Sequence, residues 1–192
     1  MYFGILAHAD PDDLDGDGIS GRPNLVWSRR FDQPMLGRFG WKAGEPTVEE
    51  QSAAAFHGDI GISSPLFTPP AGDCTEAQST CIEAPHGAGD VRGDEIDQDG
   101  LDLVSFYARN LAVPARRDVD NPQVLQGKKV FYEAQCAACH TPKFVTARLE
   151  GEARTPQSFQ LIWPYSDLLL HDMGEGLADH RPEGRATGKG FI

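Results

Sequence analysis

The sequence predicts a mainly α fold with long irregular loops. Three stretches carry helix-starting signals or helical apolar spacing: roughly 48–57, 94–111, and the residues from Asn121 up to Cys136. Strand signals are weak throughout. The 21 glycines and 14 prolines among the 192 residues break much of the remaining chain into turns and loops. We therefore expect a few helices with much loop between them.

Length and charge limit the class of protein. A chain of 192 residues forms one medium domain or two small ones and is long enough to bury a core. No run approaches the roughly 18 apolar residues that a membrane helix requires. The formal net charge of -12 argues against a nucleic-acid partner, because phosphate repels such a surface. We expect a soluble acidic protein without a membrane span.

The first expected helix follows an irregular N-terminal segment that is rich in glycine and proline. Thr47 and Glu50 form a capping box, in which the two side chains satisfy free backbone N–H groups at a helix start, and an alanine-rich run follows. This pattern predicts a helix over roughly 48–57. The next thirty or so residues form a loop that contains Cys74 and Cys81, and a loop of that length needs a tether or a function.

The second expected helix covers 94–111. Leu103, Tyr107 and Leu111 recur at a spacing of four, which places them on one stripe of a helix. Gly100 weakens the first half of this prediction, because glycine is a poor helix former.

The third expected helix leads into the most informative motif of the chain. Asn121 is a suitable N-cap and Pro122 a suitable first helical residue. The connector before them predicts a division into a loop-rich helical segment, 1–117, and a second domain, 118–192. Beyond the motif, the stretch "PYSDLLLHDMGEGLADH" predicts a short helix or turn that ends at Gly174.

Cys136, Cys139 and His140 form a C-x-x-C-H motif. Two thiols at this spacing can reach the two vinyl groups on one porphyrin edge, and the adjacent histidine can then bind the iron. Zinc is one alternative, but Cys74 and Cys81 match a second pair of zinc ligands poorly. A thioredoxin-like dithiol is another, but no βαβ pattern surrounds the motif. The motif therefore predicts one covalently bound haem c.

The sixth iron ligand must come from another part of the chain. Electron-transfer haems take Met or His in this position, and methionine raises the reduction potential. Met173 lies about thirty residues beyond His140, where the chain could fold back across the other haem face. His171 competes with it, and an open or water-bound iron is the third possibility. If this segment is extended, His171 and Met173 point to the same side; if it is helical, they diverge.

Several segments together resemble a known family. The segment "GKKVFYEAQCAACH" is similar to the haem-attachment helix of cytochrome c domains. The segments "DLDGDGISGRPN", "GRFGWKA" and "LLLHDMGEGLAD", with the Cys74/Cys81 loop, resemble the di-haem oxidoreductase family. That family is sometimes labelled thiol oxidoreductase and is related to bacterial di-haem cytochrome c peroxidases. The resemblance runs over nearly the whole chain, with the motifs in the expected order.

The resemblance implies a cytochrome c-like haem domain at 118–192. The C-x-x-C-H motif then holds the C-terminal haem, with Met173 or His171 on its other face. The family's first C-x-x-C-H lies upstream of the region covered here, and the family continues past "ATG" where this chain has "KGFI". We therefore expect a chain that is truncated at its C-terminus, and a single haem motif leaves the question of enzymatic activity open.

The expected function is the electron-transfer portion of a peroxidase-like oxidoreductase, with a simple electron carrier without turnover as the alternative. The redox partner would be a small cytochrome or the missing N-terminal haem domain. Trp41 is a candidate for the electron path, and a core tryptophan that supplies burial is the other interpretation. Covalent haem is normally attached outside the cytoplasm, so a periplasmic or extracytoplasmic location is expected, although the N-terminus lacks a signal peptide.

Asp13, Asp15 and Asp17 occupy the first, third and fifth positions of an EF-hand-like loop. Its twelfth position is Asn24 instead of the bidentate glutamate, which removes two oxygen ligands. The resemblance supports calcium here, because the related peroxidases carry a calcium ion between their haem domains. An acidic surface turn is the alternative.

Cys74 and Cys81 close a small loop. Outside the cytoplasm a disulfide is the simplest interpretation, and it would stabilise the fold by roughly 2–3 kcal/mol at this loop size. A reactive thiol pair is the alternative, but no helix N-terminus or basic cluster nearby would lower a thiol pKa.

Overall fold

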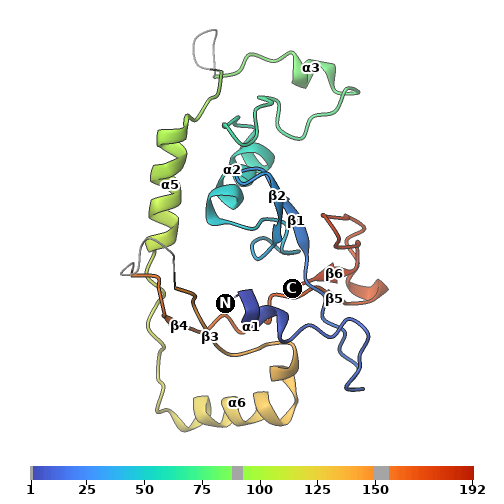
Figure 1. Cartoon of the computed structure of the whole chain (residues 1–192), viewed down its shortest axis with the longest axis vertical. Coiled ribbons are helices and arrows are strands. Elements are labelled where there is room, and N and C mark those ends of the chain that lie inside the picture. Colours follow the sequence, from blue (N-terminus) through green and yellow to red (C-terminus); the bar gives the residue numbers. More distant parts are fainter. Residues whose placement is uncertain (1, 88–92, 149–155) are drawn as a thin grey trace. The chain divides into compact units, whose positions relative to one another are not determined.

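The structure is a computed structural model, and it describes residues 2–87, 93–148 and 156–192 (Figure 1). The chain forms two compact units. Unit 1 contains residues 1–25, 41–43 and 114–192, and unit 2 contains 26–40 and 44–113. The division at 117/118 expected from the sequence stays a prediction about folding domains.

The mainly α prediction is wrong. The chain is 29% helix and 13% strand, and its described strands form three two-stranded sheets, β1–β2, β3–β4 and β5–β6. Their strands are only two to four residues long. A strand of that length is too short to establish an alternating apolar pattern, so the sequence gives no signal for it.

Unit 2 is built on two helices that pack against each other, α2 (Val48–Ile60) and α5 (Gln98–Asn110). The N-cap half of the predicted capping box is confirmed, because the Thr47 hydroxyl oxygen accepts a hydrogen bond from the N–H of Glu50 at 3.1 Å. The Glu50 carboxylate accepts from the Thr47 hydroxyl at 2.8 Å. Helix α2 extends three residues beyond the expected end and stops at Gly61, whose φ of 69° favours glycine.

Helix α5 confirms the second predicted helix, with Asp97 as its N-cap. Its buried residues are Leu101 and Ser105. The stripe identified from the sequence instead faces outward, and Leu103 is 71% and Tyr107 67% exposed.

The rest of unit 2 is the hairpin of β1 (Leu25–Ser28) with β2 (Gln33–Leu36), and the short helix α3 (Ser79–Ile82). The first residue of β1 belongs to unit 1. The carboxylate of Glu50 attaches α2 to the β1–β2 segment, because it accepts hydrogen bonds from the Ser28 hydroxyl at 2.8 Å and the Arg30 N–H at 3.3 Å.

We expect acid to weaken unit 2 partly through Glu95. Its carboxylate accepts hydrogen bonds from the backbone N–H groups of Ser63 (2.8 Å) and Gly87 (2.6 Å), and these bonds hold its pKa below the usual value. A lowered folded-state pKa contributes stability above the unfolded value of about 4.3, and this contribution is lost as the pH falls through the folded value. Urea midpoints at pH 7 and 3 should therefore differ more for the wild type than for Glu95→Gln. An equal difference would contradict this role.

Unit 1 contains helices α1 (Tyr2–Leu6) and α6 (Pro122–Glu133) and two sheets of antiparallel pairs. Strand β3 (Phe144–Val145) pairs with β4 (Leu161–Ile162), and β5 (His171–Asp172) pairs with β6 (Gly190–Phe191). Two single turns of 3-10 helix, η1 (Cys136–Ala138) and η2 (Glu175–Leu177), complete it. Its buried apolar side chains include Ile5, Phe144, Leu169 and Leu170.

The start of α6 confirms the predicted cap. The Asn121 side chain accepts a hydrogen bond from the N–H of Gln123 at 2.8 Å, and Pro122 is the first helical residue. The helix gives way to η1 at Gln135, whose φ of 59° turns the chain sharply. None of the described helices is long and apolar enough to cross a membrane.

The prediction of a short helix or turn ending at Gly174 is wrong. This segment forms strand β5, in which His171 lies opposite Phe191 and Asp172 opposite Gly190, and η2 follows it. The partner strand β6 (Gly190–Phe191) lies outside this segment, so local propensity could not reveal the pairing.

Candidate functional site

A cavity of about 460 Å³ in unit 1 brings together the residues of the C-x-x-C-H motif and both candidate distal ligands. Its lining combines apolar and aromatic side chains with the two thiols of the motif and several polar groups. The lining residues are Trp41, Gln135, Cys136, Cys139, His140, Ser166, Asp167, His171, Met173, Leu177, Phe191 and Ile192. This composition is typical of a cofactor site.

The motif reaches the cavity through η1. The positive φ of Gln135 ends α6, and the next residues fold into one tight turn in which the N–H of His140 donates to the carbonyl of Cys136 at 2.9 Å. Both thiols remain unbonded, with Cys136 exposed and Cys139 half-buried. The turn therefore presents two free thiols and an imidazole at one cavity wall.

The imidazole of His140 is held in one orientation. Its Nδ1 lies 2.9 Å from the backbone carbonyl oxygen of Tyr165, to which it donates a hydrogen bond. The ring of Phe131 packs edge-on against Tyr165, with centroids 5.6 Å apart, and lies 6.5 Å from the imidazole. A histidine that donates from Nδ1 carries its free lone pair on Nε2, which is the arrangement that a metal-binding histidine needs.

His171 and Met173 line the same cavity because β5 is extended. Residues two apart in a strand point to the same side, as expected for an extended segment. The backbone N–H of Met173 donates to the carbonyl of Lys189 at 3.0 Å, which continues the β5–β6 pairing by one residue.

The two candidate distal ligands differ in their surroundings. Nε2 of His171 lies 2.8 Å from a carboxylate oxygen of Asp167, and the two side chains are only 12% and 4% exposed. Met173 is 47% exposed at the cavity. One nitrogen of His171 is therefore already engaged, and Met173 is the more exposed of the two residues.

The surroundings of Cys139 disfavour thiolate chemistry. Burial raises the pKa of this thiol, and the negative charges of Asp167 and Asp17 raise it further. Zinc binding and dithiol exchange both use the thiolate. Over the described ranges, moreover, neither cysteine of the motif belongs to a group of three or more potential metal ligands.

Trp41 lies at the cavity with 84% of its surface exposed, and its carbonyl accepts a hydrogen bond from the N–H of Ile192 at 3.2 Å. Its ring is therefore not part of the buried core. The residue lines the same cavity as the residues of the motif.

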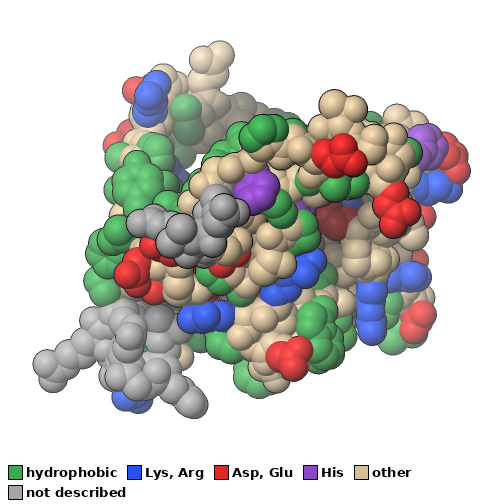
Figure 2. Space-filling view, turned by 90° about the horizontal axis from the view of Figure 1, so that it is seen from above, with side chains coloured by type: hydrophobic (Ala, Val, Ile, Leu, Met, Phe, Trp, Pro, Cys, Tyr) green, Lys and Arg blue, Asp and Glu red, His purple; other side chains and the backbone are tan. Residues whose placement is uncertain are grey.

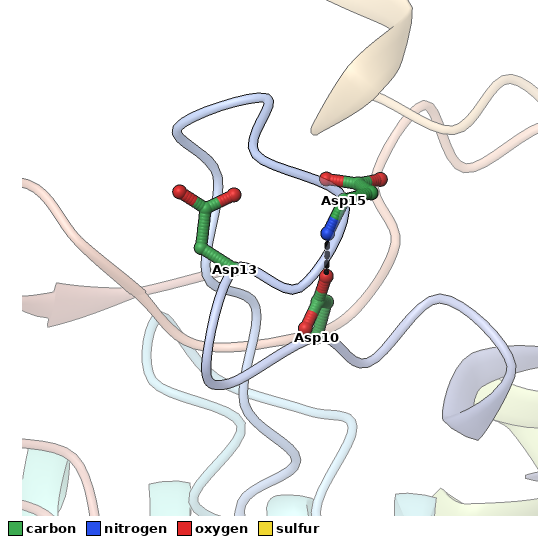
Figure 3. Close-up of side chains that lie close together, drawn as sticks. All are labelled: Asp10, Asp13 and Asp15. Carbon is green, nitrogen blue, oxygen red and sulfur yellow. Dashed lines mark hydrogen bonds between the residues drawn. The ribbon is translucent and has the colours of Figure 1, made fainter.

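The aspartate loop gathers a different set of carboxylates from the one expected (Figure 3). Ligand atoms of Asp10, Asp13 and Asp15 lie within 4.8 Å of one another. Asp10 accepts a hydrogen bond from the N–H of Asp15 at 3.2 Å, and its other carboxylate oxygen is buried without a hydrogen-bond partner. The Asp17 carboxylate instead accepts from the N–H of Ile19 at 2.8 Å and is not in this group.

Cys74 and Cys81 are joined by a disulfide in unit 2, with their Cα atoms 6.3 Å apart. The bond closes the loop that leads into α3, which contains Cys81.

Sequence reasoning missed three residues of these sites. Asp10 precedes the expected loop by three positions, and the run "ADPDDLDGDG" contains it as a further aspartate. Asp167 lies four residues before His171, a spacing that would signal a pair only on a helix. The carbonyl of Tyr165 has no sequence signal, because every residue carries a backbone carbonyl that can accept the same hydrogen bond.

Comparison with known proteins gives one match. The family model described as "Di-haem oxidoreductase, putative peroxidase" matches residues 3–191, nearly the whole chain. No curated protein and no solved structure matches.

Proposed function

The chain belongs to the di-haem oxidoreductase family, and from this premise we propose that the cavity of unit 1 holds one covalently attached haem c. Membership implies haem binding and an oxidoreductase function. In the proposal Cys136 and Cys139 attach the porphyrin and Nε2 of His140 binds the iron. The hydrogen bond from Nδ1 of His140 to the Tyr165 carbonyl carries the proposal, because it leaves the lone pair of Nε2 free on a residue that lines the cavity.

Met173 is the proposed distal ligand. The surroundings support this choice, because Met173 is the more exposed side chain at the cavity, whereas His171 is held in a buried pair with Asp167 and offers only Nδ1 to an iron. Methionine ligation would raise the reduction potential and suit electron transfer.

The proposed activity is electron transfer within a peroxidase-like oxidoreductase. When bound, the haem would supply an iron that gains and loses one electron. His140 and Met173 would hold that iron in both oxidation states, and Trp41 would offer an aromatic route at the cavity. A simple electron carrier without turnover is the second candidate. A single haem with His140 and Met173 as axial ligands would suit such a carrier as well as it suits a peroxidase-like oxidoreductase.

The redox partner in this proposal is a small cytochrome or a second haem domain. A chain with a net charge of -12 would attract a basic cytochrome at long range. On the face drawn in Figure 2 the acidic side chains are scattered among hydrophobic and polar ones, so that attraction would be diffuse there. Covalent haem attachment supports a periplasmic or extracytoplasmic location.

The test is to export the chain to a periplasm with haem-maturation machinery and to stain a denaturing gel for haem. The wild type should give a stained band, and Cys136→Ser with Cys139→Ser should abolish it. The matched control is Cys74→Ser with Cys81→Ser, which removes two cysteines without touching the motif and should retain the stain. An unstained wild-type band would overturn the proposal.

The proposed calcium site stays with the aspartate loop. The geometry supports Asp10 beside the predicted Asp13 and Asp15, whereas the Asp17 carboxylate is not in this group. Calorimetric titration with CaCl₂ should give a heat of binding that Asp13→Asn with Asp15→Asn removes. Equal heats for both proteins would exclude this loop.

A further inference from the structure

Lys42 is a buried cation that the proposed function leaves unexplained. It directly follows Trp41 in the three-residue stretch 41–43 of unit 1, and its side chain is only 3% exposed. A lysine ammonium is almost never buried to this extent unless its charge and all its donors are satisfied.

The partners of the ammonium all come from one segment near the C-terminal end of the sequence. Nζ donates to a carboxylate oxygen of Asp179 at 2.6 Å and to the backbone carbonyls of Arg181 (2.5 Å) and Thr187 (3.1 Å). These three bonds use all three ammonium donors. The hydrogen bond from Lys42 is also the first cause of the lowered pKa of Asp179.

The ammonium additionally lies 4.6 Å from the ring centroid of Phe191, within the range of a cation–π interaction. Phe191 is in β6 and lines the cavity. We name residues 179–191 the clamped segment, because Lys42 contacts it near both ends.

The clamped segment carries the strand that positions Met173. Within it, β6 pairs with β5, and the carbonyl of Lys189 accepts the hydrogen bond from the Met173 N–H. The chain of contacts therefore runs from Lys42 through β6 to the backbone of Met173.

The position of Lys42 is itself fixed from the other side. The fully buried amide of Asn24 donates to the carbonyls of Lys42 (2.9 Å) and Ala43 (3.2 Å). Its oxygen accepts from the backbone N–H of Arg185, a member of the clamped segment, at 3.2 Å. Two buried side chains thus tie the same short stretch to the same segment.

We propose that Lys42 is a positioning residue for the distal iron ligand. By gathering the clamped segment it holds β6, and through β6 it keeps the Met173 thioether over the cavity at the distance that iron binding requires. This inference rests on the proposed function above, since it needs a haem in the cavity and Met173 as a ligand. A role limited to stability would leave the iron coordination of the folded protein unchanged.

The test compares haem-loaded proteins that differ at the clamp. Lys42→Met keeps an unbranched side chain of the length of the lysine stem and removes the ammonium. Asp179→Asn weakens the same contact from a half-exposed position and keeps the test valid if Lys42→Met does not fold. The control is Lys129→Met, a lysine on α6 with 64% of its side chain exposed. The readouts are the sulfur-to-iron charge-transfer band, the reduction potential and the affinity for added imidazole.

We expect both clamp variants to lose part of the band, to have a lower reduction potential, and to bind imidazole about tenfold more tightly because the distal position is more often open. The control should match the wild type. Clamp variants that melt earlier but keep the wild-type band and potential would overturn the inference while leaving the proposed function intact. A wild type that shows haem but no sulfur-to-iron band would overturn the inference and the assignment of Met173 as a ligand, and would leave the covalent haem of the proposed function intact.

Discussion

Met173→Ala is expected to convert the oxidised, haem-loaded protein from a low-spin to a high-spin spectrum and to remove the sulfur-to-iron charge-transfer band. The physical reason is that Met173 is the cavity residue with a free thioether, and its partial exposure allows truncation with little loss of packing. The reduction potential should fall, since methionine ligation raises it. Optical spectra and a redox titration measure both changes.

His171→Gln is the matched control for this experiment. Glutamine can keep a hydrogen bond to Asp167, and the variant should retain the low-spin spectrum and the band. If the band instead survives Met173→Ala, the ligand assignment is incorrect. If His171→Gln gives the high-spin spectrum while Met173→Ala does not, His171 is the distal ligand.

An opened iron site would also separate the two candidate functions. A carrier with a closed iron should not turn over hydrogen peroxide, whereas Met173→Ala should admit it and show turnover above the wild type. Peroxidase turnover by the wild type equal to that of Met173→Ala would indicate an iron that is already accessible and would favour the enzyme.

Glu50→Ala is expected to lower the free energy of unfolding by about 3 kcal/mol, because buried donors lose a charged acceptor. Its side chain is fully buried and accepts hydrogen bonds from the hydroxyls of Ser28 and Thr47, both at 2.8 Å, as well as from the Arg30 N–H. Urea unfolding followed by circular dichroism measures the change.

The control for Glu50 is Glu83→Ala, an exposed glutamate at the end of α3. It should change the free energy of unfolding by no more than about 0.5 kcal/mol, as surface substitutions usually do. Equal destabilisation by both variants would show that the buried hydrogen bonds of Glu50 add no more to the free energy of unfolding than an exposed glutamate does.

The prediction of a mainly α class failed for an identifiable reason. Caps and helical spacing are local, so Thr47 with Glu50 and Asn121 with Pro122 located α2 and α6 from the sequence. The strands are two to four residues long, and β3 with β4 and β5 with β6 pair across more than ten residues of intervening chain. The sequence of these strand segments carries no clear strand pattern, so they were expected to be loops.

The sequence by itself determined the chemistry at one cavity wall and the helix that leads to it. Cys136, Cys139 and His140 act through their spacing, which is fixed by covalent connection within five residues. Only the tertiary structure decided how the imidazole of His140 is held, how His171 is paired with Asp167, and why Lys42 is buried. Each of these depends on a backbone carbonyl or carboxylate contributed by another segment, and such contacts form only when the chain folds.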